Sequence, residues 1–156
     1  QLESGAVMSL VSDAGTPLIS DPGYPLVRAA REAGIPVTPI PGACAFIAAL
    51  SSSGFEPDEF HFAGFLPAKP GRRRSELERL LALGTTVALY ESPHRIGKTL
   101  TDLAALSPER ELCIAREISK LHEEFLFGTA SDLLSQIAST PLKGEIVLLI
   151  RKPCSR

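Results

Sequence analysis

Residues 12–25 read Ser-Asp-Ala-Gly-Thr-Pro-Leu-Ile-Ser-Asp-Pro-Gly-Tyr-Pro, and this stretch decides the fold. It follows a short apolar run, Val7–Val11, that suits a buried strand. Asp21 followed by Pro22 is a helix-start signal, because Asp can cap free amides and Pro gives up only an amide that has no partner. The stretch therefore predicts a strand, a loop at its carboxyl end, and a helix.

This loop is a candidate ligand site. Open α/β sheets bind ligands outside the carboxyl ends of their strands, and Gly15 and Gly23 allow a ligand to approach the backbone closely. The loop has neither the GxxxxGK[ST] pattern nor the GxGxxG pattern, so its composition does not name a ligand. On spacing alone, a binding loop and a plain strand-to-helix turn remain equally good interpretations.

The pattern continues with a helix that ends at Gly34, a strand over Ile35–Ile40 and a helix over Ala43–Leu50. The prolines of this strand favour a sheet edge or a strand end. This alternation is typical of a parallel sheet. We expect Phe46, Ile47 and Leu50 to face a core. Residues 51–58 are rich in Ser, Gly and Pro and predict a linker, which gives an amino-terminal α/β domain over 1–54 and a carboxyl-terminal one over 55–156.

The second domain is predicted to be α/β with a mixed sheet flanked by helices. A capping box of Ser75 and Glu78 would start its first helix, which buries Leu77, Leu80 and Leu81, and Thr129 with Asp132 would start its last. Between these two helices, another helix would follow Ser92-Pro93, with Ile96, Leu100 and Leu103 at helical spacing. The expected strands lie at 60–66, 85–90, 111–115, 124–127 and 145–150.

Composition restricts the function classes. The chain of 156 residues has 44% hydrophobic residues and a net charge of −2, so any contact with RNA must be local. No apolar run reaches membrane-spanning length, and we expect a cytoplasmic protein with no membrane partner. Cys44, Cys113 and Cys154 are odd in number and widely spaced, which favours reduced structural thiols over disulfides or a metal site.

Two polar clusters carry more chemistry than a core requires: Tyr90–Arg95, where a strand ends, and Arg116–Glu124, a hairpin between strands. Glu91 and Glu117 both fall at strand ends, where side chains can converge on a cleft. Each cluster is also consistent with ordinary exposed polar side chains, among which an ion pair is worth about 0–1 kcal/mol. The run Gly71–Arg74 is predicted to lie on a loop, either as a solvated face or as a phosphate contact.

Six motifs in this order closely resemble the small-subunit ribosomal RNA methyltransferase I family of the tetrapyrrole methylase superfamily. They are Val11–Gly23, Pro41–Ala45, Gly64–Pro67, Tyr90–Arg95, Arg116–Glu117 and Lys143–Glu145. The resemblance covers nearly the whole chain. It implies a two-domain fold, S-adenosylmethionine as methyl donor, and the ribose 2′-hydroxyl of a cytidine in small-subunit ribosomal RNA as acceptor.

The resemblance also implies the site residues. Cofactor contacts would come from both domains: Asp13, Gly15, Thr16, Pro17, Leu18, Ala43, Cys44, Ala45, Phe46, Leu89, Tyr90, Lys143, Gly144 and Glu145. Thr16 stands where relatives carry Asp. The candidate proton acceptors are Glu91, Glu117 and His94, and the candidate RNA contacts are Arg72, Arg73, Arg74, Arg95 and Arg116. Relatives suggest a homodimer.

The largest departure from the family pattern lies at the start of the sequence. Family members begin with a strand and a Pro-Ile-Gly-Asn-type loop, which are not found here, so we expect an incomplete first sheet. Two alternatives remain open: a methyltransferase of the same fold that acts on a tetrapyrrole, against which Arg72–Arg74 argue weakly, and a module that binds cofactor or RNA without turnover.

Overall fold

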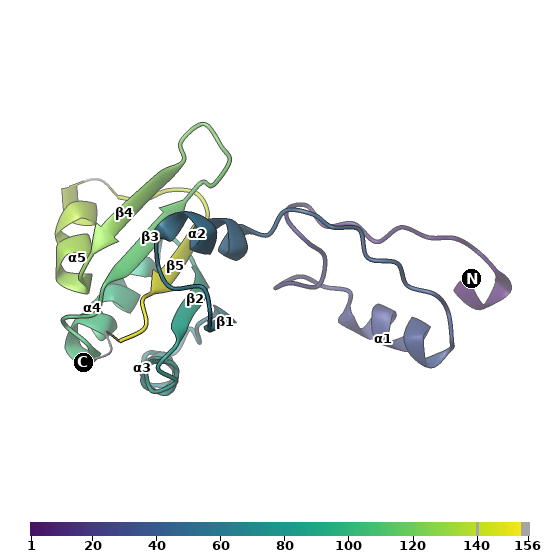
Figure 1. Cartoon of the computed structure of the whole chain (residues 1–156), viewed down its shortest axis with the longest axis horizontal. Coiled ribbons are helices and arrows are strands. Elements are labelled where there is room, and N and C mark those ends of the chain that lie inside the picture. Colours follow the sequence, from purple (N-terminus) through teal and green to yellow (C-terminus); the bar gives the residue numbers. More distant parts are fainter. Residues whose placement is uncertain (140, 154–156) are drawn as a thin grey trace. The chain divides into compact units, whose positions relative to one another are not determined.

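The computed structural model describes residues 1–139 and 141–153. The chain divides into two compact units, Gln1–Cys44 and Ala45–Arg156 (Figure 1). Cys154 lies outside the described residues. The larger unit holds a five-stranded sheet in the order β1-β2-β5-β3-β4. Its strands are β1 (Phe60–Phe65), β2 (Thr86–Glu91), β3 (Leu112–Arg116), β4 (Glu124–Gly128) and β5 (Ile146–Ile150).

The sheet is mixed, as predicted. Strands β1 and β2 are parallel, and every other neighbouring pair is antiparallel. β5 is central and entirely buried, which explains its unbroken apolar sequence, because a strand covered on both faces does not alternate. The described residues therefore confirm the α/β class and the mixed sheet.

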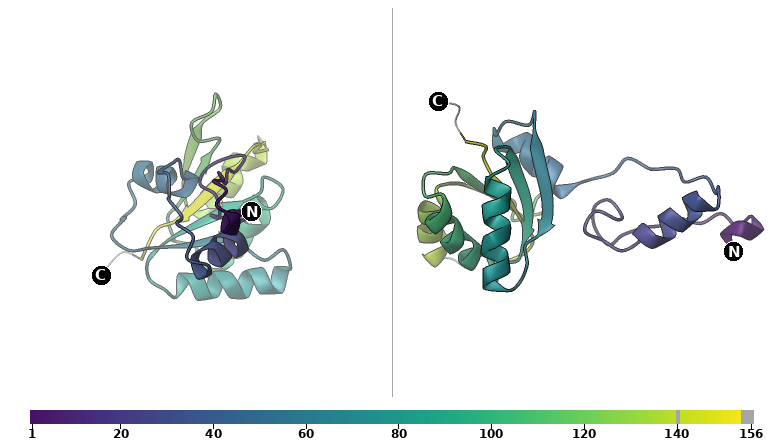
Figure 2. Two further views of the ribbon diagram at one scale, coloured as in Figure 1. Left: turned by 90° about the vertical axis from the view of Figure 1, so that its right-hand side faces the viewer. Right: turned by 90° about the horizontal axis from the view of Figure 1, so that it is seen from below.

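Three helices cover one face of the sheet: α3 (Pro70–Leu81), α4 (Ile96–Leu106) and α5 (Ala130–Ser139). Helix α2 (Ala45–Ser53) covers the other face, and Figures 1 and 2 show the arrangement. Ala49 and Leu50 of α2 are buried against this face, whereas Ile47 is exposed, contrary to the expectation. Because α2 packs on β2 and β5, it lies in the larger unit.

Helix starts follow two different rules. Thr129 and Asp132 exchange hydrogen bonds at the start of α5, which confirms the predicted capping box. The box predicted at Ser75 is wrong, because α3 already begins at Pro70 and Ser75 lies inside it. Proline suits the first helical turn, where its missing N–H has no partner in any case.

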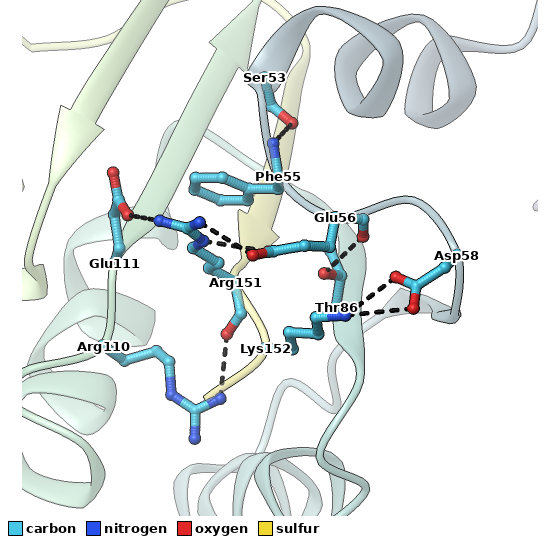
Figure 3. A network of polar contacts seen from close by, with 9 residues as sticks. All are labelled: Ser53, Phe55, Glu56, Asp58, Thr86, Arg110, Glu111, Arg151 and Lys152. Carbon is cyan, nitrogen blue, oxygen red and sulfur yellow. Dashed lines mark hydrogen bonds and ion pairs between the residues drawn. The ribbon is translucent and has the colours of Figure 1, made fainter. Parts of the chain in front are cut away.

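The segment before β1 is anchored at the end of β5 (Figure 3). Arg151 binds the Glu56 carboxylate through two nitrogens, at 2.9 and 3.0 Å, and donates to Glu111 at 2.7 Å. The Phe55 ring is buried and lies beneath the Arg151 guanidinium. Hydrogen bonding from Arg151 lowers the pKa of Glu56 to about 2. These contacts fix the segment that the sequence predicted as a linker.

The smaller unit contains one short 3-10 helix, η1 (Leu2–Ser4), and helix α1 (Tyr24–Glu32). The predicted start of α1 at Asp21-Pro22 is wrong: Gly23, with φ of 128°, interrupts the helical backbone, and Pro25 occupies the first turn instead. The predicted end is confirmed, because Gly34 adopts φ of 71° and the next amide bonds back to Ala30.

The strands predicted at Val7–Val11 and Ile35–Ile40 are wrong, since neither segment forms a strand. A strand requires a neighbour that satisfies its backbone groups, and these two segments do not pair with each other. Val7 and Ile40 are 98% and 81% exposed, so the apolar sequence that suggested burial lies open to solvent.

Candidate functional site

The smaller unit brings two predicted cofactor segments together. Thr16 Oγ1 donates a hydrogen bond of 2.9 Å to the carbonyl of Ala43. Gly15 has φ of 70°, and a Cβ placed on it would lie 3.6 Å from the same carbonyl. The first loop is thereby held next to Ala43 and Cys44, whose thiol is free.

This loop has an unusual backbone. Leu18 and Ser20 have φ of 73° and 61°, a region that side chains other than Asn and Asp rarely occupy. Such residues cluster at ligand-binding and catalytic loops, where the surrounding structure compensates for their cost. Pro17 and Leu18 are half-buried, and Asp13 is exposed.

Glu91 is a buried residue that organises the turn after β2. Its side chain is fully enclosed; one carboxylate oxygen accepts the Ser92 N–H at 2.8 Å, and the other accepts the Thr99 hydroxyl at 2.7 Å. Both oxygens are occupied within the described structure. Glu91 therefore positions the β2–α4 turn, and a reacting hydroxyl has no route to its carboxylate.

Arg95 connects the ends of two parallel strands. Its guanidinium donates to the carbonyls of Leu66 and Pro67, at 2.6 and 3.3 Å, and its Nε lies 3.3 Å from the Glu91 carboxylate. The predicted RNA contact is thus engaged inside the chain, where it holds the segment after β1 against the turn after β2.

Glu117 and the Gly144 segment form a second clasp. One Glu117 oxygen accepts the backbone N–H of Glu145 at 2.9 Å and the Lys120 ammonium at 3.0 Å. The Glu117 N–H donates to the Glu145 carbonyl at 3.0 Å. A Cβ on Gly144, which has φ of 83°, would overlap with the Glu117 carboxylate. Two predicted motifs therefore meet, and they do so at a position that only glycine fits.

The hydrogen bonds of this clasp shift the pKa values of Glu117 and Lys120. The hydrogen bond from the Glu145 backbone, followed by the one from Lys120, lowers the pKa of Glu117. Glu145, followed by Glu117, raises the pKa of Lys120. Glu117 is therefore a weaker base than an ordinary carboxylate. Lys143 is exposed next to the clasp.

His94 lies in a different environment. It is exposed, its imidazole forms no hydrogen bond with any described residue, and it lines a hollow of about 350 Å³ together with Lys98, Thr101 and Leu142. Among the three predicted proton acceptors, His94 alone has a side chain without a partner in the described chain.

The predicted RNA-binding arginines separate into two kinds. Arg72–Arg74 lie in the first turns of α3, so the predicted loop is wrong. Arg73 is buried and binds Asp102 at 2.7 Å, which removes it from any surface. Arg116 pairs with Glu124 at 2.6 Å, and Arg74 pairs with Glu78 at 3.4 Å. Arg72 is exposed, with no ion pair to any described residue.

The remaining predicted cofactor residues also differ in access. Leu89 is completely buried under the α3–α5 face, so its side chain reaches no ligand. Ala45 and Phe46 start α2, and the Phe46 ring stacks on Phe62 at 4.1 Å. Tyr90 is half-buried, with its ring 5.0 Å from that of Phe62.

The sequence did not predict two contacts of the candidate site. Lys120 lies three residues after Glu117, a spacing that would have suggested the ion pair. Thr99 gave no signal, because its bond to Glu91 joins a helix to a strand end. Among residues 1–139 and 141–153, no group of His, Cys, Asp or Glu could hold a metal ion. No helix within these ranges is both long and apolar enough to cross a membrane.

The chain is an α/β protein whose fold is shared by methyltransferases of known structure. The crystal structure of the methyltransferase CobJ matches with a TM-score of 0.67 at 19% identity, covering 91% of this chain and 63% of that one. Uroporphyrin-III C-methyltransferase from Thermus thermophilus, solved with S-adenosylhomocysteine, matches with a TM-score of 0.60 at 15% identity, covering 88% and 60%.

The family model for Tetrapyrrole (Corrin/Porphyrin) Methylases matches residues 1–134, and the chain belongs to this family. Relatives named ribosomal RNA small subunit methyltransferase I include those of Xylella fastidiosa, 51% identical over 97% of this chain, and Neisseria meningitidis, 45% identical over 96%. The chain spans about half the length of these relatives, 56% and 52% respectively.

Proposed function

We propose that the protein is an S-adenosylmethionine-dependent methyltransferase that modifies the ribose 2′-hydroxyl of a cytidine in small-subunit ribosomal RNA. The observation that carries this proposal is the identity of 45–51% with curated relatives over nearly the whole chain. The named relatives favour RNA over a tetrapyrrole, because the solved tetrapyrrole enzymes share only the fold, at 15–22% identity. We further propose a cytoplasmic homodimer.

The residues of both units fit the cofactor. Each unit offers a glycine-containing turn held by its own hydrogen bonds: Gly15 beside Ala43, and Gly144 beside Glu117. At such turns a ligand can approach the backbone directly. When bound, S-adenosylmethionine supplies an electrophilic methyl group. The backbone of each turn is the part of its own unit that would contact the cofactor.

The structure favours His94 as the proton acceptor. A ribose hydroxyl is a poor nucleophile, so a side chain must take its proton as the new bond forms. Glu91 is enclosed and fully hydrogen-bonded, and the lowered pKa of Glu117 makes its carboxylate a weak base. The His94 imidazole is exposed and has no partner among the described residues.

Two measurements test the proposal. Isothermal titration with S-adenosylhomocysteine measures cofactor binding, and incubation with S-adenosylmethionine and small-subunit RNA, followed by mass spectrometry, locates the methyl group. We expect binding and a methyl on a cytidine ribose. A His94→Gln variant should bind the cofactor normally and slow single-turnover transfer by about 100-fold or more, whereas Glu117→Gln should chiefly weaken cofactor binding. Transfer to a tetrapyrrole, or no transfer with intact binding, would refute the proposal.

A further inference from the structure

Five aromatic rings form a continuous row on the face of the sheet that α2 covers, and Phe60, whose ring lies 6.0 Å from that of Phe46, is at the end opposite Phe65. Phe46 stacks on Phe62 at 4.1 Å, Phe62 contacts Tyr90 at 5.0 Å, and Tyr90 contacts Phe65 at 5.6 Å. Phe46, Phe62 and Tyr90 are half-buried, whereas Phe65 is 56% exposed. The row therefore ends in an open ring whose orientation is fixed by its neighbours.

A bulge in β1 directs Phe65 to this face. Phe62 pairs with Ala88 and Phe65 pairs with Tyr90, so three steps on β1 match two steps on β2. The extra residue reverses the alternation at Gly64, which has φ of 62°. Without it, Phe65 would point to the opposite face. Bulges often re-aim a side chain next to a functional site.

The two segments that follow β1 and β2 carry positive charge and no acidic side chain. β1 and β2 are parallel, so the segments that follow them leave the sheet at the same edge, and Arg95 ties the two segments together. Residues 60–74 and 92–101 contain no Asp or Glu. Three exposed cations in these segments form no ion pair with a described residue: Lys69, Arg72 and Lys98.

An exposed aromatic ring at the same end of the sheet as three cations that form no ion pair with a described residue matches one class of ligand. Single-stranded nucleic acids offer flat bases and a phosphate backbone, and proteins bind them with aromatic platforms in positively charged grooves. We infer that Phe65 stacks a base of single-stranded RNA while Lys69, Arg72 and Lys98 bind the flanking phosphates. This inference rests on the proposed function, because it states how that RNA substrate is held.

The other end of β1 offers a matched control. Phe60 lies on the same strand and is 42% exposed, but Asp58 and Glu59 precede it instead of cations. Phe60 thus reproduces the residue type and the exposure of Phe65 without the positive edge. A second copy of the chain would use apolar exposure at either end, whereas RNA would use the cationic end.

The test measures fluorescence anisotropy of the full chain with a labelled single-stranded RNA of about 12 nucleotides. Phe65→Ala should weaken binding by about 5-fold to 100-fold, since stacking on one base has that effect. Phe65→Trp should retain the affinity, and Phe60→Ala should stay within about 2-fold of it. A Lys69→Gln, Arg72→Gln variant should reduce the slope of log K against log salt by about 1.4.

Three results would overturn the inference: equal losses for Phe65→Ala and Phe60→Ala, wild-type binding by Phe65→Leu, or a Phe65→Ala variant that changes only the sedimentation of a dimer. Titration with S-adenosylhomocysteine separates this site from the proposed function. Unchanged cofactor affinity in Phe65→Ala supports the inference, and loss of cofactor affinity alone contradicts it. If the chain binds RNA through Phe65 but neither binds cofactor nor transfers methyl, the proposed function fails and the inference stands.

Discussion

Gly144 lies so close to the Glu117 carboxylate that even a methyl group at its Cα would overlap with it. The two residues belong to separate motifs, and the hydrogen bond from the Glu145 N–H to Glu117 closes the contact. The clasp thus depends on the absence of a side chain at one position and on a charged acceptor at the other.

Gly144→Ala should destabilise the larger unit. The substitution forces a side chain into a left-handed backbone and displaces the Glu117 carboxylate, for an expected cost of about 1–3 kcal/mol in the free energy of unfolding. Urea denaturation measures this cost. Gly97→Ala is the control, because its added Cβ has no atom within 4 Å apart from its chain neighbours and the backbone of its own helix, and its φ is not left-handed. Equal stabilities of the two variants would contradict the clasp.

Glu56 should make stability depend on acid pH. Hydrogen bonding from Arg151 lowers its folded-state pKa from 4.5 to about 2. A carboxylate whose pKa is lower in the folded than in the unfolded state stabilises the fold fully at pH values above its unfolded-state pKa. This contribution disappears as pH falls through its folded-state pKa. The stability difference between wild type and Glu56→Gln should therefore be constant above about pH 6 and vanish near about pH 2.

Urea denaturation at several pH values gives this profile. Glu59→Gln provides a matched carboxylate removal, since Glu59 forms no ion pair with a described residue. The free energy of unfolding of Glu59→Gln should differ little from that of wild type at every pH measured. A Glu56→Gln difference that grew as pH fell would show the opposite linkage and would disprove the role of the Arg151 pair.

Arg73 should behave as a core residue. Its side chain is 6% exposed and paired with Asp102, so Arg73→Ala leaves an uncompensated carboxylate and should cost about 3 kcal/mol. The exposed neighbour variant Arg72→Ala should change stability by less than about 0.5 kcal/mol. An Arg73→Leu, Asp102→Leu double variant should recover most of the loss, because apolar pairs often replace buried ion pairs well. Additive losses in the double variant would argue against the pair.

Cys113 should resist thiol reagents. The side chain is completely buried, and burial, followed by the charge of Glu111, raises its pKa to about 12. The thiolate is the reactive form, so modification should require unfolding. In a Cys154→Ser background, a chromogenic disulfide should titrate one thiol, that of half-buried Cys44, in the native chain and two in urea. Reaction of two thiols in the native chain would contradict the burial of Cys113.

The parts of the fold that the sequence predicted are those with local signals. The central strand β5 is a run of five apolar residues, and the Thr129–Asp132 box marks a helix start without help from distant residues. Arg73 was misplaced although its position was readable: with Leu77 and Leu80 it falls at i, i+4 and i+7, on the buried stripe of one helix.

The site was harder to predict because its contacts join separate elements. The sequence selected Glu91 and Glu117 as chemical residues, yet their bonds to Thr99 and Glu145 depend on how strands and helices pack. The apolar segment Val7–Val11 was predicted to be a strand but does not form one. Hydrophobic periodicity predicts a strand only where a neighbouring strand is available to pair with it.

Ala30 is the one buried residue of Gln1–Cys44, and this has a calorimetric consequence. The heat-capacity change of unfolding scales with the apolar area that becomes hydrated, and this unit buries almost no apolar area. A scanning experiment on the chain would therefore record the melting of the sheet alone. Amide protons of residues 7–11 should exchange with deuterium at rates near those of an unstructured peptide, while those of β5 outlast every other segment.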